Sequence, residues 1–171
     1  MQLREVLLPA GARGRLFLHG MPGRREKLQD LWDGLGRLGV GVILNLTSEA
    51  ETRLRSPEYA EAIAHGRVPC DVWRLPMAND GAPDHDAEFE RLLRQVADGL
   101  RHGTVYLVHC NAGIGRTGTV AAGVLMLLGV PLVEALKTVQ AAGSGPISID
   151  QRNVLTRLAG RVTPGRGGPL V

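Results

Sequence analysis

Aromatic residues are scarce in this chain of 171 residues. It contains two Trp, two Tyr and two Phe, which together make up 4% of the sequence. Proteins that bind nucleic acids usually combine a concentrated basic patch with aromatic side chains that stack on bases. Arginine and lysine are spread along this chain without a basic block, so we expect no nucleic-acid partner despite the formal net charge of +3. We interpret the basic excess as a solvated face, with a phosphorylated or acidic partner as the alternative.

Long apolar runs are also missing. No stretch approaches the ~20 apolar residues that a membrane-spanning helix needs. The apolar segment at residues 3–8 is too short for the core of a secretory signal peptide. We therefore expect a cytoplasmic protein with no membrane partner. The length and the hydrophobic content of 44% fit one domain, placed at residues 1–162, with a flexible Gly- and Pro-rich tail at 163–171.

Only two cysteines are present, Cys70 and Cys110. One disulfide is arithmetically possible, but Cys110 lies in a loop whose chemistry needs a free thiolate, which favours a reducing compartment. We interpret Cys70 as a small core residue. The alternative is that it forms a protective disulfide with an oxidised Cys110.

Hydrophobic patterning predicts strands that alternate with helices. Strands are expected at residues 3–8, 15–19, 40–46, 71–75 and 105–108, and helices at 24–38, 57–65, 84–100, 119–128, 131–142 and from Ser148 or Asp150 to about 162. Asp84 or Asp86 is expected to cap the helix that begins there. This alternation predicts an α/β fold with a central, mostly parallel, twisted sheet of about four to five strands and helices on both sides.

The most informative segment is residues 109–118, His-Cys-Asn-Ala-Gly-Ile-Gly-Arg-Thr-Gly. It joins a predicted buried strand to a predicted buried helix. Such a junction gathers backbone N–H groups around one point and makes an anion site. Gly113 and Gly115 let the backbone turn and approach a ligand. Cys110 would lie in a positive field at the base of the loop, which lowers its pKa and favours the thiolate.

These residue types at this spacing predict covalent phosphoryl transfer. Cys110 is the expected nucleophile, and Arg116 is expected to grip two phosphate oxygens with its planar guanidinium. The loop residues expected around the phosphate are Asn111, Ala112, Gly113, Ile114, Gly115 and Arg116. Thr117 is expected to hydrogen-bond the sulfur, with a plain helix residue as the alternative. His109 is expected to act indirectly on the cysteine, with a satisfied core histidine as the alternative.

The reaction also needs an acid for the leaving oxygen. Residues 78–84, Ala-Asn-Asp-Gly-Ala-Pro-Asp, form a predicted loop beside the pocket. Asp80 precedes a glycine and is our candidate for the general acid and base, and Asp84 is the alternative. Gln151 is a candidate for positioning the attacking water. The alternative, given equal weight, is that Gln151 is simply an exposed polar residue in the first turn of a helix.

These segments together resemble a known family. Residues 109–118 match the His-Cys-x5-Arg-Thr-Gly signature of cysteine-dependent protein tyrosine phosphatases. Residues 79–84 are similar to the acid loop of the dual-specificity branch, especially its kinase-associated phosphatase and Cdc14-like groups. The resemblance covers roughly residues 15–160. It implies a protein tyrosine phosphatase-like fold without metal or cofactor, with Cys110 as nucleophile, Arg116 as phosphate binder and Asp80 as acid. One departure is the pair Ala141 and Ala142, where relatives often carry an arginine.

We therefore expect a monomeric protein phosphatase that forms a cysteinyl-phosphate intermediate. Its substrates would be phosphotyrosine and also phosphoserine and phosphothreonine in proteins, and its loop would bind oxyanions such as phosphate, sulfate or vanadate. One alternative is a phosphatase for a phosphoinositide or inositol phosphate. Lipid-directed relatives tend to carry lysines inside the loop, whereas Asn111, Ala112 and Ile114 are uncharged here. A phosphate-binding pseudoenzyme would normally lack the thiolate, the arginine or the acid, and all three are present.

Overall fold

A five-stranded sheet forms the centre of the computed structural model, which describes residues 3–162. The strands are β1 (Arg4–Val6), β2 (Arg15–His19), β3 (Val40–Asn45), β4 (Asp71–Arg74) and β5 (Val105–His109), in the spatial order β1-β2-β5-β3-β4. β1 runs antiparallel to β2, and all other neighbouring strands are parallel. The predicted α/β fold with a mostly parallel sheet is confirmed. The predicted tail at 163–171 lies outside the described residues.

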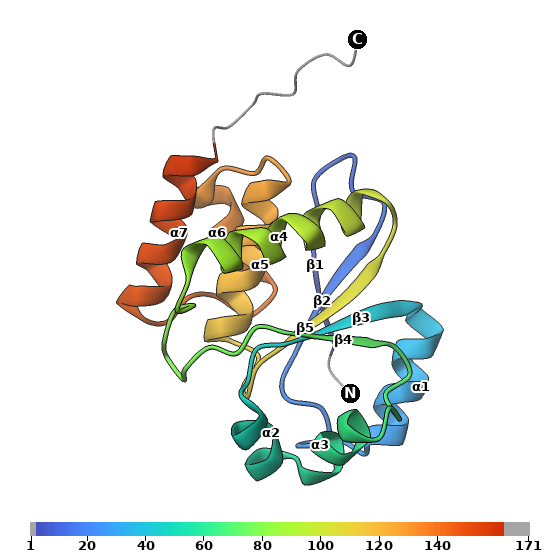
Figure 1. Cartoon of the computed structure of the whole chain (residues 1–171). Coiled ribbons are helices and arrows are strands. Elements are labelled where there is room, and N and C mark those ends of the chain that lie inside the picture. The colour runs from blue at the N-terminus through green and yellow to red at the C-terminus, as the bar shows by residue number, and fades with distance from the viewer. Residues whose placement is uncertain (1–2, 163–171) are drawn as a thin grey trace.

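Helices cover both faces of this sheet (Figure 1). They are α1 (Leu28–Leu38), α2 (Glu49–Arg55), α3 (Pro57–Ala64), α4 (Asp86–Arg101), α5 (Gly115–Leu127), α6 (Leu132–Ala141) and α7 (Ile149–Arg161). Figure 1 shows α4 to α7 grouped on one side of the sheet and α1 to α3 on the other. Within residues 3–162, no helix is both long enough and apolar enough to cross a bilayer.

Alternating side chains of the central strand feed two hydrophobic clusters. Tyr106 and Val108 of β5 belong to the larger cluster under α4 to α7, and Leu107 between them belongs to the smaller cluster beside α1. This alternation follows from the two-residue period of a strand. Every residue of α5 is buried, because this helix packs against the sheet and against α4, α6 and α7.

The carboxyl ends of four strands lie level with one another. His109 at the end of β5 pairs with His19 of β2 on one side and Asn45 of β3 on the other, and Asn45 pairs with Arg74 of β4. The segments that follow these strands therefore start at one edge of the sheet. Open α/β sheets bind ligands at this edge.

Three helix predictions differ from the structure. α5 begins at Gly115 rather than at residue 119, because the end of the 110–116 loop already winds into the first helical turn. α1 begins at Leu28 rather than at residue 24, after extended backbone at Lys27. The helix α2 was not predicted at all.

The predicted caps of α4 are wrong. His85 occupies the N-cap position, and no side chain caps the helix. Asp86 lies in the first turn, and its carboxylate instead accepts hydrogen bonds from Nε and Nη2 of Arg157 in α7, at 2.7 and 2.8 Å. A tertiary ion pair has replaced the local capping bond. Ser148, by contrast, caps α7 as predicted, because its hydroxyl accepts from the N–H of Gln151.

Candidate active site

The 110–116 loop leaves the carboxyl end of the central strand and ends in the first turn of α5. Gly113 adopts a left-handed conformation with φ +75°, which L side chains rarely adopt. A Cβ atom there would also lie 2.3 Å from the carbonyl oxygen of His19. The Gly113 N–H faces the Cys110 sulfur, with 3.2 Å from N to Sγ. The loop conformation thus requires this glycine and brings a backbone donor to the sulfur.

The carbonyl groups of the loop point away from its centre. Donors outside the loop bind the carbonyls of Asn111, Gly113 and Ile114. These donors are the Met21 N–H and Arg24 guanidinium for Asn111, the Arg4 guanidinium and Ser144 hydroxyl for Gly113, and Ser144 and the Gly145 N–H for Ile114. Because the carbonyls are held outward, the inner side of the loop is left to N–H groups. This is the arrangement that binds an anion.

The side chain of Cys110 is buried at the base of this loop. Burial alone would raise the pKa of its thiol. Interactions with Thr117 and the Gly113 N–H, together with the charge of Arg116, outweigh burial, so the pKa lies below the ordinary value. The Thr117 hydroxyl has no hydrogen-bond partner of normal geometry among residues 3–162, yet it is oriented to lower the thiol pKa. The predicted hydrogen bond between Thr117 and the sulfur therefore stays a prediction.

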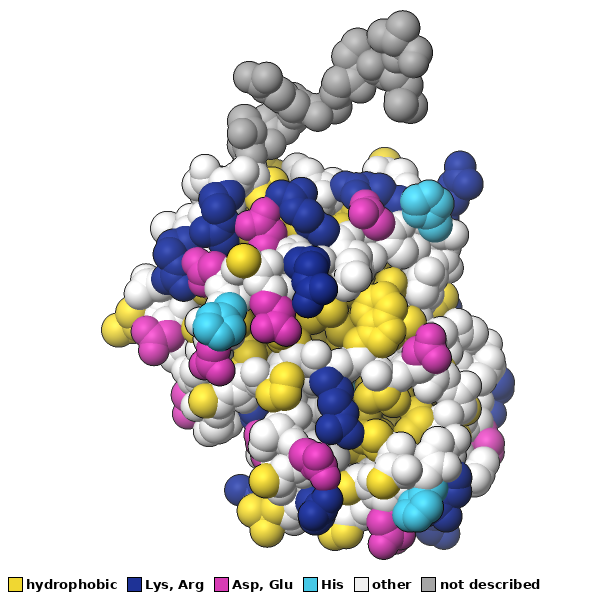
Figure 2. All heavy atoms as spheres, in the orientation of Figure 1, with side chains coloured by type: hydrophobic (Ala, Val, Ile, Leu, Met, Phe, Trp, Pro, Cys, Tyr) yellow, Lys and Arg dark blue, Asp and Glu magenta, His cyan; other side chains and the backbone are white. Residues whose placement is uncertain are grey.

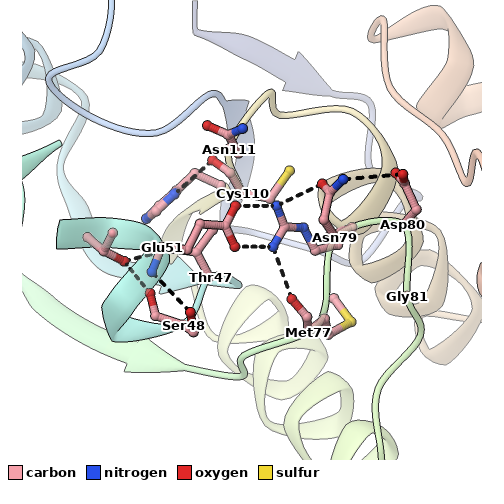
Figure 3. Close-up of polar contacts among 12 residues, drawn as sticks. Thr47, Ser48, Glu51, Met77, Asn79, Asp80, Gly81, Cys110 and Asn111 are labelled. Carbon is pink, nitrogen blue, oxygen red and sulfur yellow. Dashed lines mark hydrogen bonds and ion pairs between the residues drawn. The ribbon is translucent and has the colours of Figure 1, made fainter. Parts of the chain in front are cut away.

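Arg116 lies in the first turn of α5 and is 2% exposed. Its Nη1 and Nη2 atoms donate to the two carboxylate oxygens of Glu51 at 2.8 and 2.7 Å, a bidentate pair (Figure 3). Nη1 also donates to the Met77 carbonyl at 3.0 Å, and Nη2 reaches Asn79 Oδ1 at 3.4 Å. Burial would lower the pKa of Arg116, but Glu51 and the Cys110 sulfur raise it overall, so the guanidinium stays charged.

Glu51 was missed in the sequence because helix α2, which carries it, was missed. Ser48 caps α2 by accepting from the Glu51 N–H at 3.1 Å. A serine followed three residues later by a glutamate is a local signal for a helix start, and it was present in the sequence. No local signal could have paired Glu51 with a residue 65 positions away.

The predicted acid loop lies beside Arg116. Asp80 has φ +58° and is the one non-glycine residue with positive φ within residues 3–162. Such backbone conformations cost energy and cluster at functional sites. Asn79 links the two groups, since its Nδ2 donates to Asp80 Oδ2 at 3.2 Å while its Oδ1 accepts from Arg116. Asp84 instead lines a separate hollow with Leu75 and other residues of that surface.

His109 is fully buried behind the cysteine. Its Nε2 atom lies 3.0 Å from the Tyr59 hydroxyl, and its Nδ1 atom lies 3.3 Å from the Cys110 carbonyl oxygen. A carbonyl only accepts, so Nδ1 carries the proton and Tyr59 donates to Nε2. Burial lowers the pKa of His109 to about 3, so the ring is neutral. This geometry is compatible with an indirect role, in which the ring orients the backbone of Cys110.

Gln151 is fully buried, which overturns the alternative of an exposed first-turn residue. Its Nε2 donates to the Gly81 carbonyl in the acid loop at 3.1 Å, and its Oε1 accepts from the Ile147 N–H at 2.9 Å. The side chain therefore ties the acid loop to the segment before α7. Its predicted role toward the attacking water stays a prediction.

Cys70 lies at the opposite end of the sheet from Cys110. Cys70 directly precedes β4. The last residue of β4, Arg74, lies at the same level of the sheet as His109, because both pair with Asn45 of β3. Cys70 is four residues before Arg74, so along the strand direction it lies about 13 Å from the level of His109, at ~3.3 Å per residue. A disulfide needs Cα atoms within about 7 Å. The alternative of a direct Cys70–Cys110 disulfide is therefore excluded in this fold, and both cysteines are free.

Known proteins share this fold, and a family model matches most of the chain. A family model described as Swiss Army Knife protein, DSP-PTPase phosphatase domain, matches residues 12–153. A structure of kinase associated phosphatase, with its catalytic-site cysteine changed to serine, superposes with a TM-score of 0.80 at 19% identity, over 95% of this chain and 96% of that one. Tk-PTP in its active form gives 0.70 at 26% identity, over 90% and 99%. PTPMT1 in complex with PI(5)P gives 0.70 at 18% identity, over 86% and 91%.

The two similar structures below 25% identity establish the fold. The match to a phosphatase family model establishes the class of reaction. Its matched region spans all five residues that the signature loop needs between Cys110 and Arg116, as well as the acid loop. The resemblance to the dual-specificity branch is confirmed. The chain belongs to the Swiss Army Knife DSP-PTPase family and is a cysteine-dependent phosphatase.

Proposed function

We propose that this phosphatase removes phosphate from phosphotyrosine, and also from phosphoserine and phosphothreonine, in protein substrates. One observation carries the proposal: the buried Cys110 thiol has a lowered pKa and faces the Gly113 N–H beside the charged Arg116. A thiolate beneath a ring of backbone donors and a guanidinium is suited to attack a phosphate ester.

The first step transfers the phosphoryl group to sulfur. The Cys110 thiolate attacks phosphorus in line, and the P–S bond forms as the bond to the leaving oxygen breaks. Arg116 and the loop N–H groups hold the remaining phosphate oxygens, on which charge develops. The contact from Arg116 to Asn79 is the longest of its hydrogen bonds, at 3.4 Å, and a phosphate oxygen displaces it. Asp80, as the carboxylic acid, gives its proton to the leaving oxygen.

The second step restores the enzyme. The Asp80 carboxylate takes a proton from a water molecule as that water attacks phosphorus. The P–S bond breaks, inorganic phosphate leaves, and the electron pair returns to sulfur. The Gly113 N–H and Thr117 stabilise the thiolate as it departs, for the same reason that they lower the pKa of the free thiol.

Protein substrates are favoured over inositol phosphates by the loop itself. PTPMT1, one of the similar structures, was solved with PI(5)P bound. In this chain the side chains inside the loop, Asn111, Ala112 and Ile114, carry no charge to meet further phosphates of a headgroup. A cytoplasmic location, a monomeric state and oxyanion binding in the loop remain parts of the proposal, testable by fractionation, sedimentation and phosphate titration.

The test is a comparison of substrates with matched controls. Purified protein is assayed on phosphotyrosine, phosphoserine and phosphothreonine peptides, on PI(5)P vesicles and on p-nitrophenyl phosphate. We expect turnover of the peptides and of the aryl phosphate, and a loss on the order of a thousandfold or more in Cys110→Ser. Preferred turnover of PI(5)P would replace the protein substrate by a lipid. Undiminished turnover in Cys110→Ser would contradict the cysteine mechanism.

A further inference from the structure

A cavity of about 410 Å³ lies beside the 110–116 loop, between that loop and the segment that follows β2. Asn111, Ala112 and Ile114 of the loop form one wall. Three arginines also line the cavity, Arg4, Arg24 and Arg25. β2 and β3 flank β5 on opposite sides, and the acid loop follows β4 beyond β3. The cavity therefore lies across the catalytic loop from Asp80.

The cavity has an excess of positive charge. The Arg24 guanidinium donates to Asn111 Oδ1 at 2.6 Å through one nitrogen, Nη1. Arg25 is exposed, and its side chain makes no hydrogen bond or ion pair with any residue from 3 to 162. Glu26 is the one acidic residue in the lining, and it already accepts from the Gly23 N–H at 3.0 Å.

The remaining titratable group in the lining of this cavity adds no charge. His19 is buried, and burial lowers its pKa in spite of the nearby Glu26 carboxylate. The ring is therefore neutral at neutral pH. Three guanidinium groups and one carboxylate, which already accepts a hydrogen bond, line the cavity, and the excess positive charge attracts an anion beside the reacting phosphate.

A second cavity, of about 560 Å³, adjoins the first on the other side of Ile114. Ile114 and Gly143 line both cavities, so the two cavities adjoin at the mouth of the loop, and together we call them the trough. The second half of the trough is largely apolar, with Leu136, Pro146 and Ile147 in its wall. Ile114 is 44% exposed and Ile147 is 56% exposed, and both lie on this one surface, so the apolar area there is continuous rather than scattered.

We propose that this trough holds the peptide on either side of the phosphorylated residue. An anionic side chain, either a carboxylate or a second phosphoryl group, lies against Arg24 and Arg25, and an apolar side chain lies against Ile147. The inference rests on the proposed protein substrate and adds its sequence preference. An inositol polyphosphate would match the basic half but would leave the apolar half uncovered.

The test uses Arg25→Glu, because this side chain makes no hydrogen bond or ion pair within residues 3–162 and its change breaks no bond to the loop. Arg13→Glu is the matched control, with the same change in charge at the far end of β2 and no side-chain bond within residues 3–162. Each protein is assayed on a phosphotyrosine peptide flanked by Glu, on the same peptide flanked by Gln, and on p-nitrophenyl phosphate.

We expect the unmodified protein to prefer the Glu peptide by about three- to tenfold in kcat/KM, with a preference that falls as salt is raised. Arg25→Glu should lose or reverse this preference while turnover of p-nitrophenyl phosphate stays unchanged, and Arg13→Glu should keep it. Ile147→Ser should lose selectivity for an apolar flanking residue.

Three results would overturn the proposal. The Glu and Gln peptides could be hydrolysed equally by the unmodified protein, or Arg25→Glu could keep the preference. Vesicles with a multiply phosphorylated inositol headgroup could be preferred over both peptides, which would assign the basic half to a lipid. Peptide turnover without a charge preference contradicts the trough alone, whereas absent peptide turnover contradicts the proposed function as well.

Discussion

Arg116 is a buried cation whose position depends on a partner from a separate helix. Glu51 of α2 grips both terminal nitrogens of its guanidinium, and the partner is itself only 21% exposed. Removal of one member of such a pair leaves the other charge without its counterpart in a desolvated site. The orientation of Arg116 toward a phosphate therefore depends on a carboxylate that does not touch the phosphate.

Glu51→Gln is expected to lower kcat/KM on p-nitrophenyl phosphate by about a hundredfold, the cost of misplacing a reacting group by about 1 Å. The affinity for phosphate as an inhibitor should fall with it. Glu49→Gln is the control on the same helix, because Glu49 pairs with the exposed Arg53 and not with the site. Equal losses in the two variants would show that α2 matters only for folding.

The thiol of Cys110 sets the acid side of the pH profile. Its pKa is below the ordinary value, so the thiolate is present above that lowered pKa and is lost as the pH falls through it. Thr117→Val removes one of the groups that lower this pKa. We therefore expect the acid limb of kcat/KM to move to higher pH, and the pH dependence of alkylation by iodoacetamide to move with it.

Thr117→Ser keeps a hydroxyl at this position and should restore the acid limb. This rescue separates an effect on the sulfur from an effect of packing in α5, because Thr117→Ser keeps the hydroxyl but loses the methyl group, whereas Thr117→Val keeps the volume but loses the hydroxyl. An unchanged acid limb in Thr117→Val would mean that the Gly113 N–H and Arg116 suffice to lower the pKa.

At the scale of elements, β1 acts on the catalytic loop from the edge of the sheet. Arg4 of β1 donates to the carbonyl of Gly113 at 2.5 Å through Nη2. Its Nη1 donates to the carbonyl of Gly143 at 2.5 Å and reaches that of Ala142 at 3.4 Å, in the segment between α6 and α7. One side chain thus braces the loop against the segment between α6 and α7.

Arg4→Gln is expected to lower kcat/KM on p-nitrophenyl phosphate by between tenfold and a hundredfold, because the loop loses a support for its geometry. Arg15→Gln is the control, since Arg15 forms an exposed pair with Glu5 on the same two strands. The control should keep its rate and lose little stability, as is usual for exposed pairs. A normal rate in Arg4→Gln would show that Ser144 alone holds the Gly113 carbonyl.

The elements that the sequence predicted are those with a strong local signal. Residues 40–45 and 105–109 are apolar runs and form buried strands, and Gly39 ends α1 in a left-handed conformation, which is a common role of a glycine after a helix. The signature between Cys110 and Arg116 was readable because its chemistry is local. The partners of Arg116 and of the loop carbonyls could not be read, since Glu51 and Arg4 are distant in sequence and meet the loop only after folding.

Over the described part of the molecule, several surface charges form ion pairs between neighbouring elements. Figure 2 shows Lys and Arg side chains beside Asp and Glu side chains on the face that includes α4 and α7. The pairs Arg157–Asp86 and Arg161–Glu90 link those two helices. This pattern supports the interpretation of the basic excess as a solvated face. Arg25 is set apart from other exposed cations by its place in the lining of the cavity beside the 110–116 loop.

The central claim is that phosphate passes through Cys110 with Asp80 as the acid and base. The most direct measurement is mass spectrometry of acid-quenched protein during turnover of p-nitrophenyl phosphate. This activated substrate needs little acid in the first step, whereas the second step needs a base to take the proton from water. The account predicts a phosphoryl group on the peptide that contains Cys110, and more of it in Asp80→Asn than in Asp84→Asn. A phosphoryl group on another residue, or its accumulation in Asp84→Asn alone, would contradict the account.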